Sequence, residues 1–293
     1  MKKLIKLYIN LKVLDLIVLL FSMKEKHFLD TSVLRPLLTS PKKVKNYYLQ
    51  KLKGEKYICD YIKMEFLRGY IKSLIDFYFL LSIPHYNISE VLHVWSQKFQ
   101  IRDHKNIVVM ISNLLEFRGC IDNKEKSLRA IADYIRRLIG KLNENFKSIG
   151  NDNTYCKKGK TKLNFLPHSI NESFRSFFDT IKDNEQYKMC KINDFIYEKH
   201  KNDIQKLIEN AEKVKNSGNR EGFDKIIRSL NKLSSKKITC SGCSKLGDAV
   251  ISILVDNDMI LEHTDYSFTY LCTILNKRHN LHPNDKLIMD NSV

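Results

Sequence analysis

Two short apolar runs, one near each end of the chain, constrain the fold more than any other feature of this sequence. The first is His-Phe-Leu at 27–29, followed by Asp30, and the second is Met-Ile-Leu-Glu-His at 259–263, followed by Thr264 and Asp265. Such runs are typical of buried strands, whereas most of the chain between them has helical periodicity. Strands that alternate with helices favour a parallel sheet. The sequence therefore predicts an α/β fold, a small twisted parallel sheet sandwiched by helices and closed by both ends of the chain.

Apolar residues recur at helical spacing through most of the remaining chain. Helices are predicted over 44–51, 57–81, 88–99, 107–117 and 128–146, around 174, 195 and 204, over 223–233, from 248 onward and over 267–276. Near residue 150 the composition becomes polar and basic. We therefore expect an amino-terminal extension at 1–23, a first part of the core at 24–140, a large, mostly helical insertion at 141–243, and a second part of the core at 244–293.

The amino-terminal extension is apolar, but Lys6, Lys12 and Asp15 interrupt it. It is too short and too broken for a membrane span, and no small-residue cleavage site follows it. We expect either an added helix or residues upstream of a true start at Met23. With no export signal and no other apolar segment of sufficient length, we predict a cytoplasmic protein with reduced cysteines and no membrane partner.

The chain has a formal net charge of +17. An excess of this size favours a polyanionic partner such as RNA, although a lysine-rich composition without functional meaning explains it equally well. The excess is spread along the chain and is not confined to one tail. This distribution favours a groove for nucleic acid over a basic arm.

Four carboxylates stand where a parallel sheet would gather them. Asp30 and Asp265 each follow a predicted strand, Asp248 opens a predicted helix after Gly247, and Glu65 lies among apolar neighbours in a helix. Active sites collect at the carboxyl ends of such strands. Carboxylates that converge there repel one another unless cations neutralise them, and their hard oxygens suit Mg²⁺ or Mn²⁺. In a basic protein, these ions suit attack of water on a phosphodiester.

Three of these acids also have a simpler explanation. Asp30 and Asp248 are ordinary helix-capping residues. Glu65 is spaced to form a surface ion pair with Arg68. Taken one at a time, these explanations are preferred; the set of four in this order favours the site.

The motifs around the four acids are "HFLDTSVL", "EFLRG", "GDAVIS" and "LEHTDYSF". In these motifs and their order the chain resembles the PIN-domain ribonucleases, over about 24–120 and 244–280. The resemblance implies a PIN-like fold and a Mg²⁺ or Mn²⁺ site that activates water against RNA, with ligands at Asp30, Glu65, Asp248 and Asp265. It also implies that Thr31 and Ser32 form hydrogen bonds beside the first ligand. His263 departs from the family, which usually has Ser or Thr there, and the gap between the second and third acids is longer than in small toxin members.

We therefore predict a metal-dependent endoribonuclease that needs no protein nucleophile. The alternative is a catalytically inactive PIN-like module that binds nucleic acid or a partner protein. A third reading is a toxin that a small inhibitory partner protein neutralises.

The cysteines suggest a second metal. The pair in "CSGC" has zinc-knuckle spacing, and two more cysteines in the insertion complete a candidate Cys₄ structural zinc site: Cys156, Cys190, Cys240 and Cys243. The alternative is that the first two are incidental and "CSGC" is a turn. The other three lie in apolar runs and are expected in the core: Cys59, Cys120 and Cys272.

Overall fold

The computed structural model describes residues 24–98, 106–113, 123–149, 199–214, 220–233 and 240–290. Five strands form one sheet in which every neighbouring pair is parallel. They are β1 (Lys26–Leu29), β2 (Glu55–Cys59), β3 (Lys147–Ile149), β4 (Met259–His263) and β5 (Arg278–Leu281). The predicted α/β class, with a parallel sheet flanked by helices, is confirmed.

The strand order is β3-β2-β1-β4-β5. The two apolar runs recognised in the sequence therefore lie side by side at the centre, where Phe28 is in register with Leu261. From β1 the chain proceeds outward through β2 to β3, whereas β4 and β5 extend the sheet in the opposite direction. The order reverses between β1 and β4, and in open α/β sheets ligands bind outside the carboxyl ends of the strands at such a switch point.

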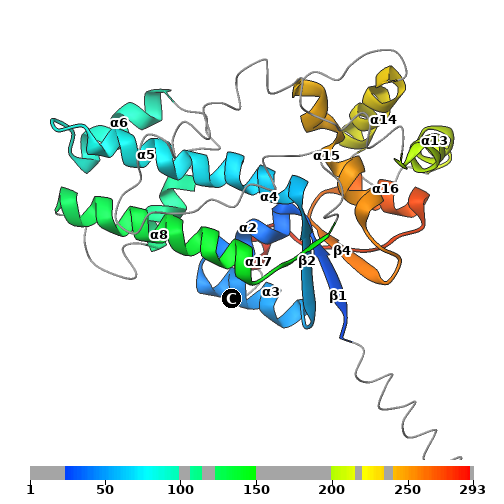
Figure 1. Ribbon diagram of the computed structural model, residues 1–293, viewed down its shortest axis with the longest axis horizontal. Coiled ribbons are helices and arrows are strands. Elements are labelled where there is room, and N and C mark those ends of the chain that lie inside the picture. Colours follow the sequence, from blue (N-terminus) through cyan, green and yellow to red (C-terminus); the bar gives the residue numbers. More distant parts are fainter. Residues whose placement is uncertain are drawn as a thin grey trace, which may run out of the picture.

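Helices cover the two faces of the sheet (Figure 1). On one side are α2 (Thr31–Thr39), α3 (Lys42–Lys51), α8 (Lys124–Glu144) and α17 (Asp285–Asp290). On the other are α13 (Lys201–Asn210), α14 (Glu221–Leu233), α15 (Cys240–Leu254) and α16 (Tyr266–Leu275). The chain after β2 forms α4 (Asp60–Phe66), the π-helix η1 (Leu67–Ile71), α5 (Lys72–Ser82) and, after a turn, α6 (Ile88–Lys98).

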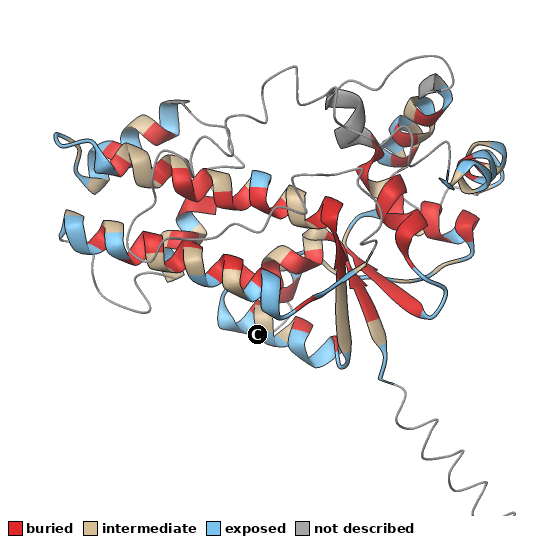
Figure 2. Cartoon of the chain, viewed as in Figure 1, coloured by how far each residue is buried: buried red, intermediate tan, exposed pale blue. Residues whose placement is uncertain are grey.

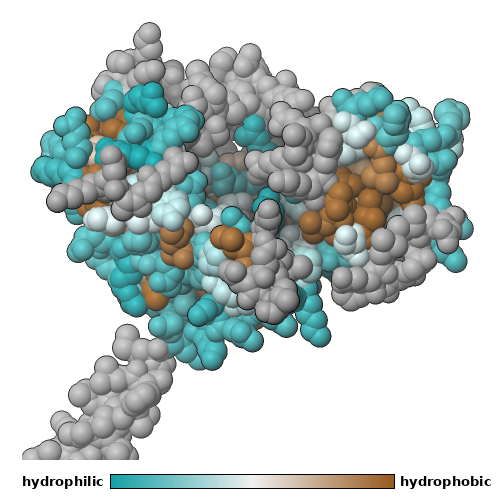
Figure 3. All heavy atoms as spheres, turned by 180° about the vertical axis from the view of Figure 1, so that it is seen from behind, coloured by the Kyte–Doolittle hydropathy of each residue, from teal (hydrophilic) through white to brown (hydrophobic). Residues whose placement is uncertain are grey.

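The central strands are buried and the edge strands are not (Figure 2). All five residues of β4 are buried, whereas β3 and β5 contain no buried residue. Burial on both faces explains why β1 and β4 appear as short, mostly apolar runs in the sequence. Seen from behind, hydrophobic atoms gather at the end of the molecule formed by α5 and α6 (Figure 3), where Ile83 and Leu92 are among the exposed large side chains.

Three sequence predictions are wrong in detail. The helix predicted from residue 57 begins at Asp60, because β2 occupies 55–59 and the spacing of Ile58, Ile62 and Phe66 continues the helical period through it. The short edge strands β3 and β5, and helix α17 after the last predicted helix, were not anticipated, since their sequences carry no apolar run or long helical pattern. Helix α15 begins at Cys240, so Asp248 lies within it and does not open it.

The range 141–243, predicted as an insertion, starts inside α8 and contains β3, which pairs with β2 in the sheet. The predicted extension at 1–23 lies outside the described residues. Among the helices that the structure describes, none is long and apolar enough to cross a membrane.

Candidate acidic site

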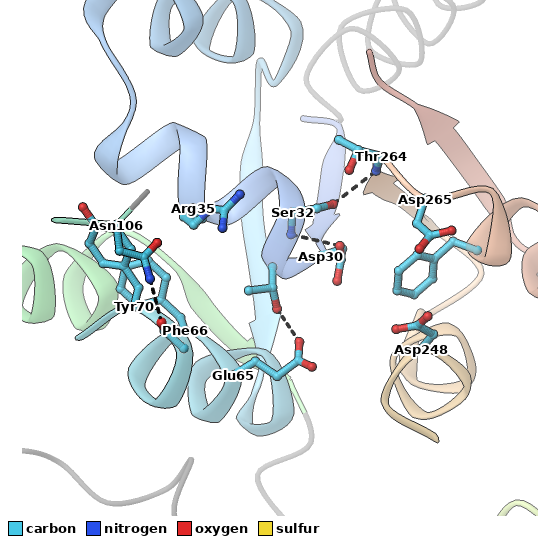
Figure 4. A pocket seen from close by; sticks show the side chains of 13 residues that line it. Asp30, Ser32, Arg35, Glu65, Phe66, Tyr70, Asn106, Asp248, Thr264 and Asp265 are labelled. Atoms are coloured by element: carbon cyan, nitrogen blue, oxygen red, sulfur yellow. Dashed lines mark hydrogen bonds between the residues drawn. The ribbon is translucent and has the colours of Figure 1, made fainter. Parts of the chain in front are cut away.

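A cavity of about 260 Å³ opens at the carboxyl edge of the sheet. Its wall includes all four acids proposed from the sequence, each from a different segment: Asp30, Glu65, Asp248 and Asp265. Figure 4 shows their side chains directed toward a common space, with Glu65 and Asp248 approaching it from opposite helices. Residues that are far apart in the chain therefore meet next to the switch point between β1 and β4.

Asp30 is both a helix cap and a wall of the cavity. It directly follows β1 in extended conformation, and its Oδ2 accepts a hydrogen bond of 2.9 Å from the backbone N–H of Ser32 at the start of α2. The residue is only 6% exposed. Burial raises the pKa of its carboxyl group, hydrogen bonds from Ser32 and Thr31 partly offset this, and the charge of Asp265 adds to the rise.

Asp265 repeats this arrangement at the neighbouring strand. It caps α16, and its Oδ1 accepts a hydrogen bond of 2.8 Å from the backbone N–H of Ser267. The two strand ends are tied together, because the N–H of Thr264 donates to Oγ of Ser32 over 3.2 Å. Asp265 is exposed, unlike Asp30. The structure thus sets one buried and one exposed carboxylate side by side at the switch point.

Glu65 is held from across the cavity. The hydroxyl of Thr31, in the first turn of α2, donates a 2.6 Å hydrogen bond to Oε2 of Glu65 on α4. Two residues after Glu65 the helix widens into η1, a form that often occurs at functional sites. The carbonyl of Gly69 in that turn accepts hydrogen bonds from Ser73 Oγ at 3.1 Å and Asn106 Nδ2 at 2.9 Å. These contacts hold the turn of η1 that follows the helix of Glu65.

Asp248 reaches the cavity because α15 packs closely against α4. A Cβ atom at Gly247 would lie 2.4 Å from the ring of Tyr61, so only glycine permits this approach. Gly247 is therefore a contact point between the two helices. Burial raises the pKa of Asp248 well above its ordinary value, and the charges of Asp30, Glu65 and Asp265 raise it further.

The donor set fits a hard divalent cation in its chemistry, since it consists of carboxylate oxygens. The raised pKa of Asp30 and of Asp248 shows that the cavity disfavours uncompensated negative charge. Within the described ranges, no group of three or more His, Cys, Asp or Glu side chains lies close enough to hold a metal ion. The acids therefore share a cavity without forming a preassembled metal centre.

Other residues singled out in the sequence lie elsewhere. Cys156 and Cys190 fall outside the described residues, and Cys240 and Cys243 belong to the first turn of α15, where side chains are not described. The zinc hypothesis thus stays a prediction. Cys59 and Cys272 are buried, which confirms their expected place in the core, and the expected core residue Cys120 is not described.

His263, which departs from the family pattern, does not line the cavity. Its ring is fully buried and lies against Phe268 at 5.4 Å and His279 at 5.3 Å between ring centroids. Desolvation lowers the pKa of His263 to about 4. It is therefore a neutral core residue, and the backbone of Thr264 makes the hydrogen bond that joins the two strand ends.

Other residues of the wall were not predicted from the sequence, notably Arg35, Asn106, Tyr70 and Phe268. Arg35 had one available signal, since it follows Thr31 by four residues and so shares its helix face. Asn106 had none, because nothing in its local sequence indicates that it bonds to η1. No family model, curated protein or solved structure matches the chain with statistical significance.

Proposed function

We propose that this chain is a metal-dependent endoribonuclease of the PIN-like type. One observation carries the proposal: four carboxylates from separate segments line a single cavity at the switch point of a parallel sheet. Each stands within a motif that resembles its counterpart in the PIN-domain ribonucleases. A structural cap or a surface ion pair explains one such acid but does not explain why all four meet.

The chain's own residues would act as follows. Asp30 and Asp265 are fixed by the helices that they cap, Glu65 by Thr31, and Asp248 by the close contact between α15 and α4. These carboxylates would hold Mg²⁺ or Mn²⁺. A bound ion would lower the pKa of the attacking water. It would also stabilise the negative charge that develops on the phosphate during attack on the phosphodiester.

The charge distribution supports a polyanionic substrate. The chain carries a net charge of +17, which attracts RNA, whereas the acidic cavity itself disfavours negative charge. We infer that RNA approaches through the protein's overall field and that the cation makes the cavity compatible with a phosphate group. Activity should therefore require the divalent ion even where binding does not.

The test is cleavage of a labelled single-stranded RNA in Mn²⁺ by the wild type and by Asp30→Asn and Asp265→Asn. Asparagine also caps helices well, so each variant keeps its fold and loses one charge. Asp256→Asn is the matched control, because Asp256 is exposed and does not line the cavity. We expect cleavage by the wild type and the control and almost none by the two site variants.

One observation favours the alternative of a non-cleaving module that binds nucleic acid or a partner protein. The carboxylates are not gathered at ligand distance in the part of the chain that is described. A wild type that binds RNA and leaves it intact at every Mg²⁺ and Mn²⁺ concentration would establish this alternative. Cytoplasmic location, inhibition by a small partner protein and structural zinc are predictions from the sequence alone.

A further inference from the structure

Arg35 brings a positive charge to the acidic cavity. It lies on α2 one turn after Thr31, so both side chains share the helix face that borders the site. Figure 4 shows its guanidinium on the same side of the cavity as Ser32, beyond the group of acids. Of the described residues that line the cavity, Arg35 alone is cationic.

The guanidinium group is available to a ligand. It forms no hydrogen bond or ion pair with any residue in the described part of the chain; the hydroxyl of Thr39 donates to the backbone carbonyl of Arg35 at 2.8 Å and leaves the guanidinium untouched. Burial raises the pKa of Asp285, and a 3.2 Å hydrogen bond from Ser40 Oγ and the charge of Arg35 only partly offset this rise. A half-buried arginine without a salt bridge, beside a cavity, has unused donors.

Those donors suit one kind of group. The guanidinium presents a planar fork that matches phosphate oxygens, and it binds phosphate in bidentate fashion. Thr31, which contacts Glu65, and Arg35 are separated by four residues of helix, or about 6 Å along its axis. The long side chain of Arg35 therefore starts one helical turn from the contact that orients Glu65.

We propose that Arg35 binds the phosphate next to the one that the acidic site attacks, so that the substrate is a polynucleotide strand and not a mononucleotide. The inference rests on the proposed nuclease function, because it takes the acids as the reaction centre. Arg35 is then a substrate-positioning residue. One phosphate is attacked at the acidic site, and its neighbour is bound by the positively charged guanidinium.

The first test measures binding without cleavage. The affinity of a short fluorescein-labelled single-stranded RNA is determined by anisotropy in EDTA at several salt concentrations, with wild type, Arg35→Gln, Arg35→Lys and Arg129→Gln. Arg129 is the matched control, since it is exposed on α8 and pairs with Glu125. Circular dichroism melts verify that each variant is folded. The melt of Asp285→Asn shows how much stability depends on the charge of Asp285, on which the charge of Arg35 acts.

We expect Arg35→Gln to weaken RNA binding about tenfold, as for loss of a charged hydrogen-bonded contact. The slope of log affinity against log salt should fall by about 0.7, the value for one phosphate contact to a single strand. Arg35→Lys should keep the slope and lose part of the affinity, because it retains the charge without the fork. An Arg35→Gln protein with wild-type affinity and wild-type slope overturns the proposal.

The second test separates this inference from the nuclease function. In Mn²⁺, Arg35→Gln should raise KM about tenfold with a smaller change in kcat. A substrate in which a neutral methylphosphonate replaces the phosphate beside the cleaved linkage should impair cleavage by the wild type much more than cleavage by this variant. Cleavage with unchanged KM would refute the role of Arg35 and leave the nuclease standing. RNA binding that depends on Arg35, in a protein that never cleaves, would refute the nuclease and retain the phosphate subsite.

Discussion

Thr31 donates a hydrogen bond of 2.6 Å from its hydroxyl to Oε2 of Glu65, joining the first turn of α2 to α4. Asp30 caps the same turn, so the chain places a capping acid and a donor to a second acid in consecutive positions. The orientation of two carboxylates in the cavity thus depends on one helix start. This coupling can be tested without changing any of the acids.

Thr31→Val should lower Mn²⁺-dependent cleavage by about 10- to 100-fold, the usual effect of removing a hydrogen bond that orients a metal ligand. Valine has nearly the shape of threonine, so the loss comes from the missing donor. The Mn²⁺ concentration for half-maximal activity should rise in parallel. Thr31→Ser keeps the hydroxyl and is the control; if serine and valine variants are equally impaired, the hydrogen bond to Glu65 is not the cause.

Asp248→Asn should make the protein more stable at neutral pH. The pKa of Asp248 in the folded protein lies well above its ordinary value of 3.8, because of burial and the neighbouring acids. The folded state therefore binds a proton more tightly than the unfolded chain, and wild-type stability falls as pH rises from about 3.8 through the folded pKa. Asparagine carries no such penalty, and we expect a gain of about 0.5–2 kcal/mol at neutral pH.

Urea unfolding of wild type and Asp248→Asn over a pH series measures this difference. The two proteins should converge below the ordinary carboxyl pKa, where Asp248 is protonated in both states. Added Mn²⁺ should stabilise the wild type and have little effect on the variant, because ligand binding to the folded state adds stability by mass action. Equal stabilisation of both proteins would remove Asp248 from the proposed ligand set.

The central strands could be predicted from the sequence because they are buried on both faces. β1 and β4 therefore appear as short, mostly apolar runs. The edge strands β3 and β5 gave no such signal, since their side chains stand largely in solvent. Residues 57–59 were assigned to a helix because apolar residues four apart continue the helical period from β2 into α4.

The acids could be predicted to meet because each follows a strand or stands in a recognisable motif. Their partners could not, because contacts such as that between Gly247 and Tyr61 depend on how two helices pack. Capping a helix and lining the site are also not exclusive roles. Asp30 and Asp265 each satisfy the first turn of a helix and face the cavity with the same side chain.

Glu262→Gln should destabilise the protein without changing the acidic site. Glu262 is buried and accepts hydrogen bonds from His27 Nδ1 at 2.8 Å and His282 Nε2 at 2.5 Å. Burial raises its pKa, but these two bonds outweigh that effect and hold the pKa below its ordinary value of 4.5. The stability that they contribute is present above about 4.5 and is lost as pH falls through the folded pKa.

We expect Glu262→Gln to cost about 1.5–3 kcal/mol at neutral pH, the range for a hydrogen bond to a charged group. The difference from wild type, measured by urea unfolding, should narrow below the ordinary carboxyl pKa. Glu262 does not line the cavity, so cleavage per folded molecule should be unchanged. A constant difference across the whole pH range would show that packing, and not the carboxylate charge, is responsible.

Comparing Asp30→Asn with Asp30→Ala separates the two roles of this residue. Both variants remove the carboxylate and should abolish Mn²⁺-dependent RNA cleavage. Only alanine also removes the acceptor for the N–H of Ser32, so Asp30→Ala should be less stable than Asp30→Asn by about 1 kcal/mol in urea unfolding. If the alanine variant is destabilised yet still cleaves RNA at the wild-type rate, Asp30 is only a cap, and the proposed metal site loses the ligand that links β1 to the other three acids.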